Sequence, residues 1–359
     1  MTTLSSNKDS LASPIGNPCL NKLCYGPIVR RPVILVAVLA LLASAACGAT
    51  GPTITLYNAQ HQDLAQAWID AFTAETGIRV EARRGGDFEL ANQIIAEGDN
   101  SPADVFVAEN SPAQSLLSNQ GRLATLPQTT LDQVPGHYRS GKNDWVGVAA
   151  RSTVLVYNPS LVGADKLPTS IVDLDRPEWK GRVGVAAGGA DFQAIASAVF
   201  AVDGTARADA WLTGLKQNAR VYQNNIAVMK AVNAGEVPAG VIYHYYWYKD
   251  RQESGQDSRN TELKFFGGKD AGAFVSVSGA SVVASSKHPE EAQRFIAFIS
   301  GQAGQKVLTS TLAMQYPVGV GAQQSPVLKP FAELDPPAID PNTLNGPQVI
   351  QEMQRVGLI

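Results

Sequence analysis

Short apolar runs alternate with segments of helical periodicity from about residue 53 onward. Apolar residues recur at helical spacing over residues 64–72 and 90–95, and Gly77 marks the end of the first of these segments. Strands are predicted before, between and after them, at residues 54–57, 78–80 and 104–107. This βαβαβ order predicts an α/β fold with a largely parallel sheet covered by helices.

The same alternation returns later in the chain. The predicted elements there are a strand at residues 183–185, helices at 192–200, 210–215 and 225–234, and a strand at 239–243. Residues 274–279 alternate in the manner of a strand, and residues 289–299 and 348–356 are predicted helices. Because chains beyond about 300 residues usually exceed one core, we predict two lobes with a ligand cleft between them.

The N-terminus departs from this pattern. Arg30 and Arg31 precede an apolar run at residues 33–42, and the small residues 43–46 lead to Cys47. A basic flank, an apolar core and a small-residue exit are typical of a secretory signal. The apolar core is shorter than the roughly 20 residues that a membrane-spanning helix needs. We therefore predict an exported protein.

Cys47 resembles the lipid-modified cysteine of bacterial lipoproteins. Ser44 stands where such signals usually have an aliphatic residue, so simple cleavage and a retained anchor stay open as alternatives. We predict a leader at residues 1–46 and a lipid-anchor linker at residues 47–52.

Composition and charge narrow the class of protein. The chain has 359 residues, of which 45% are hydrophobic and 17% charged, as in soluble globular proteins. Removing the leader takes away four basic residues and one acidic residue, which changes the net charge from −3 to −6 and argues against nucleic-acid binding. Cys19 and Cys24 lie in the leader, so Cys47 is the only cysteine of the mature chain. A structural disulfide and a thiolate zinc site are thereby excluded.

Tyrosines concentrate at one place. Four of the ten tyrosines of the chain fall within the six residues 243–248. A phenol is normally protonated, but a highly charged cation stabilises the phenolate, and hard oxygen donors suit Fe³⁺. Simple aromatic packing is the alternative. Neighbouring strand residues point to opposite faces, so Tyr245 and Tyr246 can share one ion only if the strand ends near Tyr243 and a helix follows.

Several short motifs accompany this cluster in a fixed order. They are residues 56–61 (LYNAQH), 93–94 with 97–99, 101–106 (SPADVF), 108–109, 154–159 (VLVYNP), 177–181 (PEWKG), 235–238 (GEVP) and 245–248 (YYWY). In these motifs the chain resembles the ferric-ion-binding proteins of bacterial ABC importers, within the periplasmic binding-protein superfamily. The resemblance implies two lobes, a two-strand hinge and an interlobe cleft. The implied ranges are 53–150 and 277–327 for the first lobe, 151–276 for the second, and 328–359 for a C-terminal helical segment on the lobes.

The resemblance also implies a ligand set. His61 corresponds to an imidazole ligand, Glu109 to a carboxylate ligand, and Tyr245 and Tyr246 to phenolate ligands. One carboxylate and two phenolates cancel three positive charges, and four donors leave two octahedral positions for a small anion or water. Taken singly, each residue has a simpler interpretation. His61 would be a surface or capping residue, and Glu109 an acid at a helix N-terminus.

The same resemblance places an anion, carbonate or phosphate, beside the ion. Gly188, Gly189 and Ala190 correspond to a turn that opens a helix, and Asn225 to an asparagine that touches the anion. Arg151 resembles an arginine that binds carbonate in some relatives, with a solvated surface arginine as the alternative.

Tyr243 replaces a second asparagine of some relatives. It is a candidate third phenolate or a hydrogen-bond donor to another ligand, and the alternative is that it packs against the cleft wall. The remaining histidines, His137, His244 and His288, are predicted to lie on the surface.

The sequence contains neither a Gly-x-Ser-x-Gly elbow nor a Gly-Lys-Ser/Thr nucleotide loop, so we predict no enzyme activity and a separate ATPase chain. The hypothesis is an extracytoplasmic, monomeric lipoprotein that captures Fe³⁺ and delivers it to an ABC permease. The alternative is a binding protein for another solute, such as thiamine, a polyamine or a phosphonate.

Overall fold

The first half of the predicted pattern is confirmed in the computed structural model, which describes residues 51–359. The elements in order are β1 (Thr53–Asn58), α2 (Gln62–Thr76), β2 (Arg79–Arg84), α3 (Asp87–Glu97) and β3 (Val105–Ala108). Gly77 ends α2 in the left-handed region with φ of 72°, which glycine adopts without steric cost. β1 pairs in parallel with β2 and β3, as the βαβαβ order requires.

The remaining elements continue in chain order. They are α4 (Ser111–Asn119), α5 (Gln128–Leu131), β4 (Val146–Tyr157), β5 (Val183–Val185), α6 (Ala190–Asn218), β6 (Ala219–Val221), α7 (Asn225–Ala234), β7 (Ala239–Tyr243), α8 (His244–Glu253), β8 (Glu262–Phe265), β9 (Val275–Val282), α9 (Pro289–Ser300), α10 (Gln302–Ser310) and α11 (Gly346–Arg355). The two helices predicted between residues 192 and 215 form the single element α6, which is broken at Gly204, where φ is 77°. Short 3₁₀ turns complete the order, such as those at Gly98–Asn100, Ile171–Asp175 and Ala271–Ala273.

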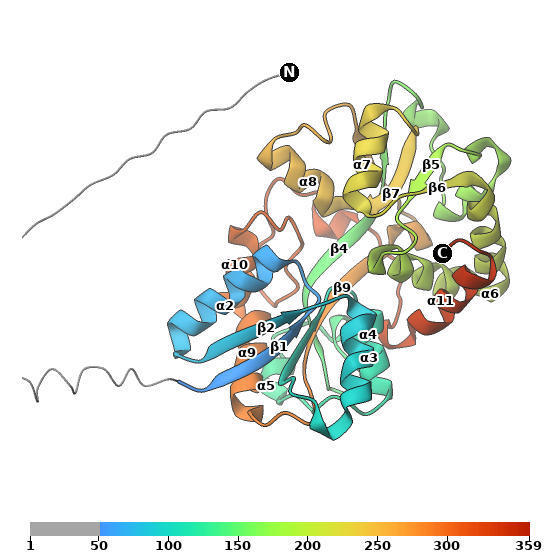
Figure 1. Ribbon diagram of the computed structural model, residues 1–359. Coiled ribbons are helices and arrows are strands. Elements are labelled where there is room, and N and C mark those ends of the chain that lie inside the picture. The colour runs from blue at the N-terminus through green and yellow to red at the C-terminus, as the bar shows by residue number, and fades with distance from the viewer. Residues whose placement is uncertain (1–50) are drawn as a thin grey trace, which may run out of the picture. The chain divides into compact units, whose positions relative to one another are not determined.

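Two long strands join the two lobes. β4 pairs with β9 through residues 146–152 and with β7 and β8 through residues 153–157 (Figure 1). The strand order of the sheet is β2-β1-β3-β9-β4-β7-β5-β6, with β8 also on β4. The first lobe therefore holds β1, β2 and β3, and the second holds β5 to β8. β4 and β9 form the predicted two-strand hinge, and the predicted boundary at residue 150 falls inside β4. The residue ranges of the lobes stay a prediction.

The prediction of a largely parallel sheet holds inside the lobes and is wrong at the centre. β5 pairs in parallel with β6 and β7, but every pair that involves β4 or β9 is antiparallel. The reason is the topology, because β4 leads from the first lobe to the second and β9 leads back. A returning strand beside an outgoing one must run in the opposite direction.

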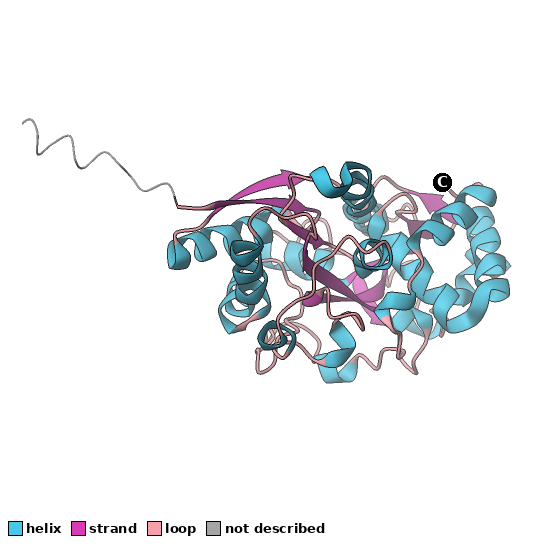
Figure 2. Ribbon diagram, turned by 90° about the horizontal axis from the view of Figure 1, so that it is seen from below, coloured by secondary structure: helices cyan, strands magenta, loops and turns pink. Residues whose placement is uncertain are grey.

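Helices cover the strands on both sides (Figure 2). In the first lobe, the ring of Phe72 on α2 packs edge-on against Phe295 and Phe298 on α9, with centroid distances of 5.0 Å and 5.6 Å. Trp68 and Phe72 are almost completely buried, and each such side chain contributes roughly 1.5–3 kcal/mol by leaving water. The C-terminal helix α11 packs on α6 of the second lobe and also contacts α4 of the first. Among the described residues, no helix combines the length and apolar character of a membrane span.

The surface predictions for three histidines are tested by this packing. His137 and His288 are exposed, as predicted, whereas His244 is fully buried. His244 begins α8 directly after β7, so its ring faces β4, where Nδ1 accepts the N–H of Ser152 at 3.1 Å. Burial lowers the pKa of His244 to about 3, so the ring is neutral.

The predicted leader, linker and Cys47 lie at the N-terminus, and residues 1–50 are outside the described part of the chain.

Candidate metal centre

The four predicted ligands come from three places in the chain and meet at one edge of the sheet. His61 precedes α2 just after β1, and Glu109 follows β3. Because β1 and β3 are parallel neighbours, their carboxyl ends lie at the same edge. β7 ends at Tyr243 and α8 begins at His244, so Tyr245 and Tyr246 lie in the first turn of a helix. The condition for two adjacent tyrosines to face one ion is therefore met.

The donor atoms of three of these residues form a tight triangle. His61 Nε2 lies 2.7 Å from Tyr245 Oη and 2.9 Å from Glu109 Oε1, and Tyr245 Oη lies 3.0 Å from Glu109 Oε1. Donors at right angles around an ion with bonds of about 2.1 Å are separated by about 3.0 Å. The ring of Tyr246 packs against that of Tyr245 at a centroid distance of 4.1 Å. The three contacts have hydrogen-bond lengths, and the same spacing would suit donors around one ion.

Asp191 is a fifth candidate ligand, which the sequence interpretation missed. It lies at the start of α6 and is 4% exposed. Its Oδ2 accepts hydrogen bonds from Asn225 Nδ2 at 2.8 Å, from Tyr246 Oη at 3.0 Å and from Tyr245 Oη at 3.4 Å. In the sequence, an acid just inside a predicted helix is typical of a stabilising surface residue. A signal was nevertheless present, because Asp191 directly follows the turn that was assigned to an anion.

Within residues 51–359, Asn225 is the one predicted anion residue that hydrogen-bonds to this carboxylate. Gly189 donates its own N–H to the carbonyl of Ala186 at 2.9 Å, and Gly188 is exposed. Ala190 is the first residue of α6. Asn225, which was predicted to contact an anion, donates its side-chain N–H to Asp191 Oδ2. The carboxylate of Asp191 is therefore the group bound to the Asn225 amide, whereas the sequence predicted a free anion at that amide.

Arg151 is a buried cation beside the tyrosines. It is 0% exposed, which excludes the alternative of a solvated surface arginine. Its Nη2 donates to Gln315 Oε1 at 3.0 Å, whereas Nε and Nη1 have no hydrogen-bond partner within residues 51–359. The guanidinium lies 5.7 Å from the ring centroid of Tyr245 and 5.9 Å from that of Tyr243. Arg151 thus places a fixed positive charge next to the donor atoms.

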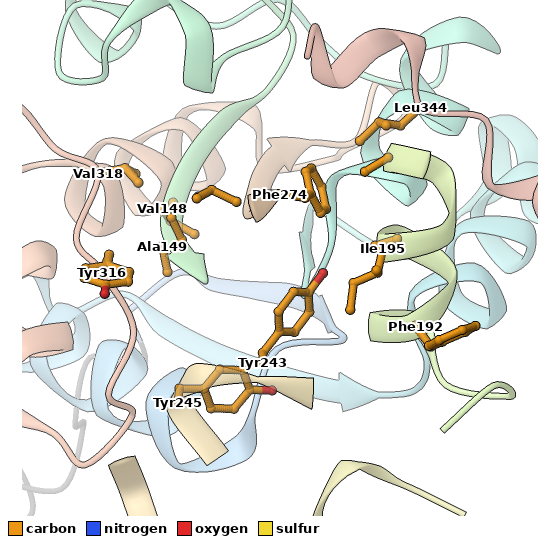
Figure 3. Close-up of a cluster of buried hydrophobic side chains, with 14 of the residues drawn as sticks. Val148, Ala149, Phe192, Ile195, Tyr243, Tyr245, Phe274, Tyr316, Val318 and Leu344 are labelled. Carbon is orange, nitrogen blue, oxygen red and sulfur yellow. The ribbon is translucent and has the colours of Figure 1, made fainter. Parts of the chain in front are cut away.

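Tyr243 is fully buried beside the cluster, and its hydroxyl has other partners. It lies 3.4 Å from Asn110 Oδ1 and 3.5 Å from the carbonyl of Asp191. Figure 3 shows the hydroxyls of Tyr243 and Tyr245 pointing in different directions, although the two rings stack at 6.4 Å. Among the hydrogen bonds of the described residues, none joins Tyr243 to His61, Glu109 or Tyr246. This placement favours the packing alternative over a third phenolate.

Burial and the nearby negative charges oppose deprotonation of the two phenols, Tyr245 and Tyr246. Burial, together with the negative charges of Asp191 and Glu109, raises the pKa of Tyr245 and Tyr246 well above 10. Burial also raises the pKa of Asp191, and the charge of Glu109 adds to this effect. Burial opposes ionisation of Glu109 as well, but its hydrogen bond to His61 and the charge of that ring lower its pKa. Only a strongly charged cation bound among these groups would convert both phenols to phenolates at neutral pH.

The residues present suit a hard cation of high charge. Among the described residues, no three His, Cys, Asp or Glu side chains form a metal site by themselves, so the tyrosines are required. A cavity of about 470 Å³ adjoins the cluster, and His61, Tyr245 and Tyr246 are among the residues that line it. Leu312 and Ile226 border the same cavity and are partly exposed. The donor atoms are therefore reachable through a cleft.

Comparison with known proteins agrees with this description. A family model described as bacterial extracellular solute-binding protein matches residues 100–339. The chain belongs to this family. The solute-binding protein is 48% identical over 329 residues to the Fe(3+)-binding periplasmic protein of Serratia marcescens, an alignment that covers 91% of this chain and 97% of the relative.

Two further comparisons extend the likeness. The major ferric iron-binding protein of Neisseria meningitidis serogroup B is 38% identical over 310 residues, which cover 85% of this solute-binding protein and 93% of the relative. The crystal structure of iron-bound HitA from Pseudomonas aeruginosa matches with a TM-score of 0.81 and 44% identity, over 85% of this chain and 99% of that one. The predicted two-lobed binding-protein fold is thereby confirmed.

Proposed function

We propose that this solute-binding protein captures Fe³⁺ between its two lobes and delivers it to an ABC importer. The observation that carries the proposal is the convergence of Tyr245 and Tyr246 with Glu109, His61 and Asp191, whose donor atoms are linked by contacts of 2.7–3.4 Å. Phenolate and carboxylate oxygens are hard donors, and imidazole is an accepted partner for iron. The relatives named above carry names that describe ferric-iron binding.

The charges of the proposed donors balance a trivalent ion. Two carboxylates and two phenolates supply four negative charges, one more than Fe³⁺ cancels. Arg151 supplies the remaining positive charge from a fully buried position. The loaded site is therefore neutral without carbonate or phosphate, and a buried site is most favourable when its charges are compensated. Five protein donors leave one octahedral position for a water molecule on the cavity side.

The two lobes contribute different parts of the donor set. His61 and Glu109 belong to the first lobe, and Asp191, Tyr245 and Tyr246 belong to the second. The ion contacts all five only when the lobes are closed, so iron favours the closed state by its differential affinity. Opening about β4 and β9 separates the ion either from the two donors of the first lobe or from the three donors of the second. The protein acts by binding and release and performs no covalent chemistry.

The proposal includes an extracytoplasmic location. Export by the N-terminal signal and lipidation at Cys47 would hold a monomeric binding protein at the membrane, next to its permease and the separate cytoplasmic ATPase. Metabolic labelling with a fatty acid checks the anchor, with Cys47→Ser as the matched variant. Labelling of that variant equal to the wild type would contradict lipidation at this residue.

The visible absorption spectrum of the iron-loaded protein tests the main proposal. Phenolate bound to Fe³⁺ gives a charge-transfer band, so one equivalent of iron should colour the protein. Tyr245→Phe and Tyr246→Phe should each weaken the band strongly, whereas Tyr222→Phe, a tyrosine outside the cluster that contacts Glu236, should leave it unchanged. A colourless protein that holds one equivalent of iron would refute the phenolate ligands, whereas failure to bind iron would favour another solute.

A further inference from the structure

The side chain of Asn110 joins the two lobes and the hinge at a single point. Its Nδ2 donates to Asp191 Oδ1 at 3.0 Å and to Asp87 Oδ2 at 3.3 Å. Its Oδ1 accepts from Ser276 Oγ at 2.7 Å and from Tyr243 Oη at 3.4 Å. The amide N–H₂ and the amide carbonyl of Asn110 therefore both form hydrogen bonds. Asn110 is 2% exposed.

This arrangement is not the usual role of asparagine at such a position. Asn110 is the N-cap residue of α4, where an asparagine side chain typically accepts a backbone N–H of the first turn. Here the side chain makes no capping hydrogen bond. It extends across the cleft instead, so its contacts contribute to the joining of the lobes rather than to the start of its own helix.

The four hydrogen-bond partners of Asn110 belong to different parts of the fold. Asp87 lies on α3 in the same lobe, and Ser276 lies on the hinge strand β9. Asp191 on α6 and Tyr243 on β7 belong to the second lobe. Hinge opening therefore breaks the two contacts with the second lobe, while the contact with Asp87 persists.

Asn110 contacts the oxygen of Asp191 that does not face the tyrosines. The two carboxylate oxygens are held by two amides, Oδ1 by Asn110 from the opposite lobe and Oδ2 by Asn225 from the same lobe. With Oδ1 occupied, Oδ2 is the oxygen that lies 3.0 Å from Tyr246 Oη. The carboxylate is thus oriented to offer one oxygen to an ion.

We infer that Asn110 is a positioning residue that couples lobe closure to completion of the donor set. When the lobes close, its amide reaches Asp191 and fixes that carboxylate as a ligand through one oxygen. When they open, the orientation is lost together with the contact across the cleft. This inference rests on the proposed function, because Asp191 must be a ligand for its orientation to matter.

The rate of iron release measures this coupling. Iron-loaded protein is mixed with an excess of a strong competing chelator at constant pH, and the loss of the visible band is followed. Asn110→Ala removes a hydrogen bond to a charged group, worth about 1.5–3 kcal/mol, and should speed release about 10-fold to 100-fold. Asn110→Asp should speed it further, because a third carboxylate would then face Asp87 and Asp191.

A double-mutant comparison separates positioning from a general loss of structure. In an Asp191→Ala background there is no carboxylate to orient, so Asn110→Ala should change the release rate less than twofold. Asn225→Ala is the matched control within one lobe. It removes the other amide from Asp191 but breaks no contact between lobes, so its effect on release should be smaller than that of Asn110→Ala.

Release from Asn110→Ala within twofold of the wild-type rate would overturn the inference. Equal acceleration with and without Asp191 would also overturn it, because the effect would then be structural. Failure of the wild-type protein to develop a visible band with iron is a different result, which would refute the proposed function itself. The melting temperature of iron-free Asn110→Ala verifies the fold and should stay within a few degrees of the wild type.

Discussion

Replacing Asp191 by asparagine should make iron binding depend on an added anion. Asp191→Asn keeps the shape of the side chain but removes one negative charge from the donor set. With Fe³⁺ bound, the wild-type site is neutral once Arg151 is counted, whereas the variant site carries one excess positive charge. Oδ2 of Asp191 also accepts three hydrogen bonds, from Asn225, Tyr246 and Tyr245, and an amide in its place cannot serve as an anionic ligand.

The magnitude follows from the burial of the group. Removing one partner from a buried, compensated set of charges costs about 3–5 kcal/mol. At 1.4 kcal/mol for each factor of ten, the affinity for iron should fall about 100-fold to 5,000-fold in a buffer without carbonate or phosphate. Adding either anion should recover a large part of the loss, because the anion restores both the charge and the missing donor next to Asn225.

The assay is the partition of iron between the protein and a competing chelator, with and without added carbonate or phosphate. Wild-type affinity should change less than threefold on adding the anion. In the double variant Asp191→Asn/Arg151→Met the response to the anion should disappear, because the excess positive charge is gone. Asp99→Asn is the control, since the Asp99 side chain is 99% exposed.

Two results would refute this reasoning. One is a wild-type protein that binds iron only when carbonate is supplied, which would return Arg151 to the role of an anion-binding residue. The other is an Asp191→Asn variant with unchanged affinity in the anion-free buffer. The first result would show that Asp191 does not replace the anion, and the second would remove Asp191 from the ligand set.

Three further predictions concern pH, Tyr243 and the core. Because the pKa values of both phenols are raised well above 10, each phenol loses a proton when iron binds, so affinity should fall about 100-fold per pH unit on acidification. Burial opposes the charged form of His61, but its hydrogen bond to Glu109 and the charge of that carboxylate raise its pKa above the usual value. The fall should therefore steepen where His61 takes up a proton, and His61→Ala should reduce this steepening. Affinity titrations from pH 5 to 8 that give a constant value would contradict both statements. Tyr243→Phe should keep the visible band at full intensity, and a band reduced by a third or more would show that Tyr243 is a ligand. Phe72→Ala should lower the free energy of unfolding by about 3–5 kcal/mol in urea titrations, because it opens a cavity between α2 and α9, and a loss below 1 kcal/mol would mean that this packing is not tight.

Local patterns in the sequence determined most of the elements. The helix at Asn225–Ala234 and the strands at Val183–Val185 and Ala239–Tyr243 have the predicted bounds, because each is an uninterrupted run with one clear periodicity. The sequence also singled out Tyr245 and Tyr246 through their concentration in one short segment. These two tyrosines could share an ion only if the strand ended near Tyr243 and a helix followed. The start of α8 at His244 meets that condition.

Contacts between distant segments determined the rest. The surface prediction for His244 was wrong because its burial depends on β4, which lies about ninety residues earlier in the chain. Arg151 and Asp191 resemble ordinary surface charges in the sequence, since nothing beside them in the chain shows that both are enclosed.

The direction of the central strands likewise depends on a return from the other lobe. Periodicity reports on neighbours within a few residues, whereas burial, charge compensation and strand direction depend on which segments the fold brings together. The sequence by itself therefore determined the elements and four candidate ligands. Only the tertiary structure showed that a buried carboxylate and a buried guanidinium lie beside these residues, because both groups reach them through contacts that the chain makes only when folded.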